Sequence, residues 1–155
     1  MRREGEERIC YCMDRDVITA EDIDEICVNR VTSHIFDMIN AIAEGKQKRA
    51  LDLYYELLAL KEPPMRILFL IARQCNILLQ VKELKAKGFD NKRIGEKLGL
   101  PSFAAAKNVS QASRFKVEDL REAVAQCVEA EEAVKMGRMN DVMSVEVLIM
   151  SVLKA

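Results

Sequence analysis

The sequence contains no tryptophan, and aromatic residues make up only 5% of its 155 residues. Strands are usually rich in aromatic and β-branched residues, so this shortage disfavours a β fold. The chain instead has eight methionines together with many Leu, Ile and Ala residues, which favour helices. Half of the residues are hydrophobic, which is enough for the core of one domain with a fragment of a second.

Residues suited to catalysis are also scarce, because the chain has a single histidine, His34. The glycine-rich patterns of phosphate-binding and dinucleotide-binding loops are absent, as is the G-x-S-x-G pattern of serine hydrolases. The carboxylates Glu129, Glu131 and Glu132 are nearly consecutive, so they point around a helix rather than at one substrate. We therefore expect no catalytic residue and no bound cofactor. An enzyme in which His34 pairs with an acidic side chain is the alternative.

Cysteine is present in an odd number and without the paired spacing of a disulfide framework. Cys10 and Cys12 are one residue too close together for the common zinc knuckle, so we expect no metal site. Cys27, Cys75 and Cys127 lie among apolar residues of predicted helices, where cysteine acts as a small hydrophobic residue. This usage indicates a reduced, cytoplasmic protein.

Charge and hydropathy exclude several further classes of protein. The first residues, MRREGEER, include no apolar run and do not form a signal peptide. The longest apolar stretch is interrupted by Arg73, Lys82 and Glu83, so we expect no membrane span. A formal net charge of -1 argues against a general attraction to nucleic acid. Residues 85–116 nevertheless carry eight basic side chains against two acidic ones, and such runs are usually solvated helix faces.

Hydrophobic residues recur with helical spacing along nearly the whole chain. The stretch from Met65 to Leu84 is apolar on most sides, which is typical of a helix at the centre of a bundle. No segment alternates in the manner of a strand. We therefore predict an all-α helical bundle of eight helices: one opened by a cap at Thr19, one that ends near Gly45, one around residues 50–58, and then Pro64–Lys87, Asn91–Leu98, Pro101–Ala112, Val117–Met136 and Asp141–Leu153.

Residues 87–115 have the outline of a helix-turn-helix. Gly99 is placed for the turn, and Gly95, four residues earlier, for a close contact between the two helices. The outer face expected for the second helix has few long side chains for base edges: Ser102, Ala105, Ala106, Lys107, Asn108 and Gln111. Two interpretations stay open, a structural corner of the bundle or a nucleic-acid contact through Lys92, Arg93, Lys97, Lys107 and Arg114.

An ordered series of segments resembles the C-terminal part of the delta subunit of the bacterial DNA polymerase III clamp loader. The segments are HIFDMINAIAEGKQKRALDLYYELL, LKEPPMRILFLIARQCNILLQVKELKAKG, RIGEKLGLPSFAAAKNVSQASRF, LREAVAQCVEAEEAVKMGR and SVEVLIMSVL. The resemblance runs from about Thr19 to Leu153 and lies in the order and spacing of residues rather than in one motif. Among the residues that carry it are Gly45, Pro64, Gln74, Lys82, Gly88, Gln111, Arg114, Phe115, Lys135, Gly137 and Glu146.

This resemblance implies a chain of two parts. Residues 1–30 would be the tail of a small helical AAA+ lid domain, and residues 31–155 a helical, collar-like oligomerisation domain. The sliding clamp is contacted in this family by an N-terminal domain that the sequence lacks. We therefore expect the chain to be part of a longer protein.

The resemblance also implies a non-catalytic role in assembly. In this family collar domains pack into a ring, so the expected partners are other loader subunits, of the gamma/tau and delta-prime type, with DNA an indirect partner and no membrane. An isolated collar face would also permit self-association. The stretch 87–115 would then be scaffold, and a helical nucleic-acid-binding module is the alternative. Interface anchors are often aromatic, Met or Arg, which makes the candidate contacts Tyr54, Tyr55, Met136, Arg138, Met139 and Met143.

Overall fold

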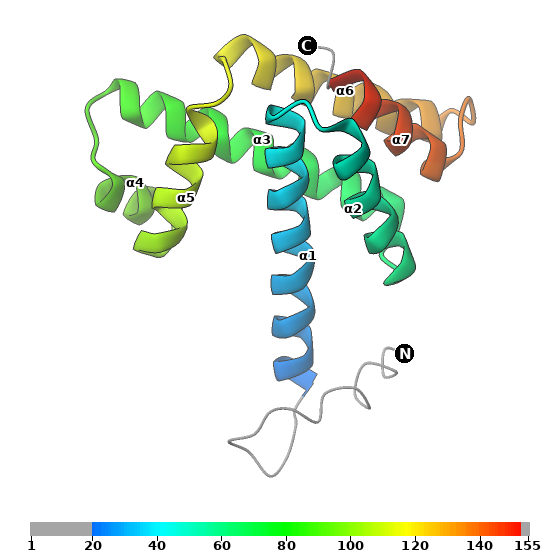
Figure 1. Ribbon diagram of the computed structural model, residues 1–155, viewed down its shortest axis with the longest axis horizontal. Helices are drawn as coiled ribbons and strands as arrows, with labels where there is room; N and C mark the ends of the chain where they lie inside the picture. The colour runs from blue at the N-terminus through cyan, green and yellow to red at the C-terminus, as the bar shows by residue number, and fades with distance from the viewer. Residues whose placement is uncertain (1–19, 153–155) are drawn as a thin grey trace.

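The computed structural model describes the backbone of residues 20–152 and the side chains of residues 30–152. Within this range the chain is entirely helical, which confirms the predicted fold class (Figure 1). Seven helices follow one another: α1 (Ala20–Ala43), α2 (Gln47–Ala59), α3 (Pro64–Ala86), α4 (Asn91–Leu98), α5 (Ser102–Ala112), α6 (Val117–Lys135) and α7 (Asp141–Val152). The expected cap at Thr19 lies outside the described residues.

The first helix corrects one expectation, because α1 is continuous where two helices were predicted. Its sequence from residue 20 to residue 43 contains neither Gly nor Pro, so no residue forces the helix to stop. Figure 1 shows its first turns extending beyond the other helices. α1 passes through residues 30 and 31 without a break, and the boundary proposed there between two domains stays a prediction.

α3 is the central helix, and it packs against α1, α4, α5, α6 and α7. Pro64 stands in its first turn, where the missing N–H group would have no helical partner. Its buried residues are Ile67, Leu68, Ile71, Cys75, Leu78 and Val81. The prediction of a central helix is thus confirmed, but α3 is not covered on every side, because Phe69 is 65% exposed.

A chain of amide hydrogen bonds, centred on the buried side chain of Gln111, joins α1, α3 and α5. The Gln74 amide on α3 donates to Asn108 Oδ1 at 2.8 Å and to Gln111 Oε1 at 2.9 Å, both on α5. The Gln111 amide in turn donates to the carbonyl oxygen of Phe36 at 3.1 Å and to Asn40 Oδ1 at 2.9 Å, both on α1. Both N–H groups of each glutamine are therefore satisfied, as a buried polar group requires.

This network corrects the expected orientation of α5. Ala105, Asn108 and Gln111 were expected on its outer face, yet all three are buried. They face inward because the amides of α5 find their partners on α1 and α3. Ser102, Ala106 and Lys107 are exposed, as expected.

The corner between α4 and α5 depends on two glycines. Gly99 ends α4 with a φ of 72°, in the left-handed region that favours glycine. Gly95 lies where the helices touch, because a Cβ atom there would stand 2.8 Å from the carbonyl oxygen of Leu100 and 3.1 Å from Ala105 Cβ. The close contact predicted for Gly95 is thereby confirmed.

Replacing the central amide tests how much the network stabilises the fold. Gln111→Leu leaves the Gln74 amide, the Phe36 carbonyl and Asn40 short of a partner inside the protein. We expect the free energy of unfolding to fall by about 3 kcal/mol, measured by urea denaturation. Ser110→Ala, at an exposed position next to it, is the control and should change stability by less than about 0.5 kcal/mol. Equal stability of the two variants would contradict this account.

A methyl group at Gly95 tests the contact between α4 and α5. Alanine is the better helix former by about 1 kcal/mol, so Gly95→Ala would stabilise a helix with open space around it. Here the Cβ atom meets backbone atoms, and we expect a loss of about 1–3 kcal/mol in thermal or urea unfolding. Glu96→Ala, on the exposed side of the same helix, controls for helix propensity. A Gly95→Ala protein more stable than wild type would refute the close contact.

Candidate subunit interface

The outer face of α7 is apolar although it is open to solvent. Val142, Met143, Val147 and Met150 are 37 to 48% exposed, and Glu146 lies among them on the same side of the helix. The opposite side, with Ser144, Val145, Leu148 and Ile149, is buried. A helix that is apolar on both sides usually has neighbours on both sides. We call these five exposed or half-buried residues, Val142, Met143, Glu146, Val147 and Met150, the α7 outer face.

Hydrogen bonds fix the first turn of α7. Asn140 Oδ1 accepts from the backbone N–H of Met143 at 2.8 Å, which caps the first turn of the helix. Ser144 Oγ donates to the carbonyl oxygen of Ala130 on α6 at 2.9 Å. The α7 outer face is therefore presented by an anchored helix.

Two adjacent tyrosines of α2 join it to α7 in different ways. Tyr55 is 44% exposed and donates to Glu146 Oε2 at 2.6 Å, and this hydrogen bond raises the pKa of its phenol. Tyr55 thus borders the α7 outer face, in keeping with its candidate role. Tyr54, predicted as an interface residue, is a core residue instead: it is fully buried and donates to the carbonyl oxygen of Val142 at 2.9 Å. Because helical neighbours point in different directions, only Tyr55 remains available to a partner.

The other candidate contacts lie in the turn between α6 and α7. Met136 is 72% exposed, and Arg138 is exposed beside it. Met139 is half-buried and lines a groove of about 310 Å³ between the two helices. The same groove contains Gln126, whose Oε1 atom is buried without a hydrogen-bond partner among the described residues.

Sequence reasoning missed Val147, Met150 and Gln126. The spacing of Met143, Val147 and Met150 is that of a helical stripe, but α7 has a second apolar stripe, and the sequence alone does not show which of the two faces the core. Nothing in the sequence marks the unpaired oxygen of Gln126, because its lack of a partner arises from the packing of α6 against α7.

Three of the five basic residues proposed for nucleic acid lie on α4. Lys92, Arg93 and Lys97 are all exposed. The Arg93 guanidinium and the Lys97 amine lie 4.9 and 5.2 Å from the centre of the Phe89 ring. These distances are typical of cation–π contacts, which hold both side chains against their own domain.

The two remaining basic residues contact α1 and the residue that directly follows it. Lys107 lies 5.5 Å from the centre of the Phe36 ring, and Arg114 Nη1 lies 3.0 Å from Glu44 Oε2. The pKa of Glu44 is lowered by its contacts with Lys46 and Arg114. Lys107 and Arg114 therefore have partners within the chain. On α5, the helix that would have contacted the bases, the amide residues Asn108 and Gln111 are buried against the rest of the bundle. These contacts support the interpretation of residues 87–115 as a structural corner.

His34 has an acidic partner but no free ring nitrogen. Its Nε2 atom lies 3.0 Å from Glu56 Oε1 on α2, and its Nδ1 atom 3.1 Å from the carbonyl oxygen of Arg30. With both nitrogens occupied, the imidazole joins α1 to α2 and is not placed to activate a nucleophile.

In residues 30–152 no group of three or more His, Cys, Asp or Glu side chains is arranged to hold a metal ion. No helix in the described part of the chain is long and apolar enough to cross a membrane.

Comparisons with known proteins agree with the resemblance seen in the sequence. The family model for the C-terminal domain of the DNA polymerase III delta subunit matches residues 32–152. DNA polymerase III subunit delta of Bacillus subtilis (strain 168) is 28% identical over 149 residues, covering 96% of this chain and 43% of the relative. The solved structure of the Bacillus subtilis DNA clamp loader delta protein superposes with a TM-score of 0.76 at 29% identity, covering 92% of this chain and 42% of that one. The chain thus spans less than half the length of these relatives, and it belongs to the family formed by the C-terminal domains of DNA polymerase III delta subunits.

Proposed function

We propose that this chain is the non-catalytic assembly part of a clamp-loader delta subunit in the bacterial cytoplasm. It packs with other loader subunits, of the gamma/tau and delta-prime type, in a ring of helical domains that supports the loading of the sliding clamp during DNA replication. The observation that carries this proposal is the α7 outer face, an apolar helix side left open by the described chain. Membership of the delta family supports it.

The α7 outer face has the chemistry of an interface core. Met and aromatic residues are enriched at interfaces, and this face combines two methionines with the neighbouring Tyr55. Complete burial of a Val or Met side chain contributes roughly 1.5–3 kcal/mol, so each half-exposed residue has roughly 1 kcal/mol left to gain. Burial of four such residues would strengthen the binding of a partner measurably, although the entropy lost on association offsets part of the gain.

The groove beside this face adds a polar requirement for the partner. Glu122 and Glu129 line it together with Gln126, whose buried Oε1 atom lacks a donor. An Arg or Lys side chain of a neighbouring protein would supply both the positive charge and the missing donor. The α7 outer face would then provide affinity and the groove would select the partner.

Introducing charge on the α7 outer face tests the proposal. The double substitution Met143→Glu and Val147→Glu, in the full-length delta protein, places two carboxylates where apolar contact is needed. We expect binding to the other loader subunits to weaken at least about tenfold. The measurement is size-exclusion chromatography with light scattering, after mixing with those subunits, and circular dichroism checks that the helices remain.

Phe69→Glu and Phe103→Glu form the matched control. These residues are 65 and 70% exposed and lie on α3 and α5, outside the α7 outer face. The control should leave the assembly intact, because it adds the same charge elsewhere. An unchanged assembly with the α7 variant, or an equal loss with the control, would remove the α7 outer face from the proposed interface.

A further inference from the structure

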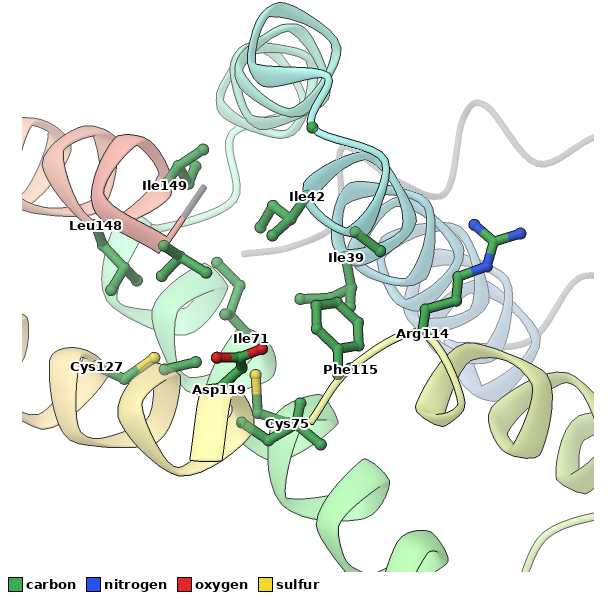
Figure 2. A pocket seen from close by; sticks show the side chains of 15 residues that line it. Ile39, Ile42, Ile71, Cys75, Arg114, Phe115, Asp119, Cys127, Leu148 and Ile149 are labelled. Atoms are coloured by element: carbon green, nitrogen blue, oxygen red, sulfur yellow. The ribbon is translucent and has the colours of Figure 1, made fainter. Parts of the chain in front are cut away.

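A cavity of about 270 Å³ lies within the bundle. It is lined by α1, α3, α6 and α7 together with the segment that links α5 to α6, and it is partly open to solvent (Figure 2). The lining is largely aliphatic, and its members include Ile39, Ile71, Phe115, Ala123, Leu148 and Ile149. None of the residues of the α7 outer face contributes to it, so the cavity and the proposed interface are separate features.

Two buried thiols belong to the apolar wall. Cys75 and Cys127 line the cavity, and burial raises the pKa of both thiols to about 12. At neutral pH they therefore stay protonated and behave as small hydrophobic groups. A well-studied engineered cavity of about 150 Å³ with Leu, Ile and Phe walls stays dry and binds benzene. The cavity of this chain is larger and has walls of the same kind, so it has room for a bicyclic molecule.

One acidic group interrupts the apolar lining. Asp119 stands in the first turn of α6 and is half-buried, and Figure 2 shows its carboxylate among the apolar side chains. A carboxylate in such surroundings can accept a hydrogen bond from a ligand. The rim includes Gly45 and Arg114, both exposed, which marks the side from which a ligand would enter. Arg114 is occupied there by Glu44.

We propose that this cavity binds a small, flat, apolar molecule that carries one N–H or O–H group. The aliphatic walls and the Phe115 ring contact its body, and Asp119 accepts its polar hydrogen. A molecule of the size of indole meets these requirements. Because the ligand contacts four helices at once, it binds the folded chain only and raises its melting temperature.

Indole and indene form the matched pair of probes, since they share a shape and only indole has an N–H group. The chain has no tryptophan, so the fluorescence of added indole is read without interference from that residue. We expect indole to bind with a dissociation constant below about 1 mM and indene about fivefold more weakly. Asp119→Ala should remove this preference while both probes still bind. Indole that does not bind the wild-type chain, or that binds no better than indene, would overturn the proposal.

Filling the cavity provides the second arm of the experiment. Ala123→Leu places an isobutyl group inside the cavity and should weaken indole binding at least about tenfold. Ala125→Leu, at an exposed position of the same helix, is the control and should bind indole like the wild type. If Ala123→Leu does not fold, Ala43→Leu fills the cavity from α1 and serves in its place. Indole binding that survives in a folded variant with a filled cavity would place the ligand elsewhere and refute the assignment.

Discussion

The arrangement of the helices depends on the buried amide of Gln111. α5 is short and contributes few large apolar side chains, so the packing of its volume alone does not fix its position. Directional hydrogen bonds do so instead: Gln111 accepts from Gln74 on α3 and donates to α1. α4 depends in turn on α5, because Gly95 rests against Ala105. Loss of the Gln111 hydrogen bonds would therefore displace both α4 and α5. An aliphatic side chain at the same position would allow α5 to take several orientations, because its contacts are not directional.

Helix boundaries were largely readable from residues that act locally. α4 has the predicted bounds, and α3, α5 and α6 differ from prediction by one residue at one end, since Pro64 and Gly99 impose their backbone preferences wherever they occur. It was harder to predict which side of each helix faces the core. The polar residues of α5 resembled a solvated face because nothing in the local sequence shows that Gln74, more than thirty positions away, supplies the partner.

The candidate interface was predictable in part for a similar reason. Composition placed candidate contacts on α2, on α7 and in the turn before α7, and Tyr55, Met136 and Met143 are indeed exposed there. It could not separate Tyr54 from Tyr55, since the two have the same chemistry and differ only in direction. Direction is decided by which neighbour covers which side of a helix, and that information belongs to the assembled fold rather than to any segment.

The unbroken α1 has a mechanical consequence. Its 24 residues span about 36 Å, and among its described side chains the core residues begin at Val31. A helix without Gly or Pro resists bending, so α1 is rigid along its length, and its C-terminal part is packed in the bundle. A rotation of the first turns of α1 would therefore be transmitted along the helix to Asn40 and its hydrogen bond with Gln111. The bundle would then follow such a rotation as one body, because α1 has no break between residues 20 and 43.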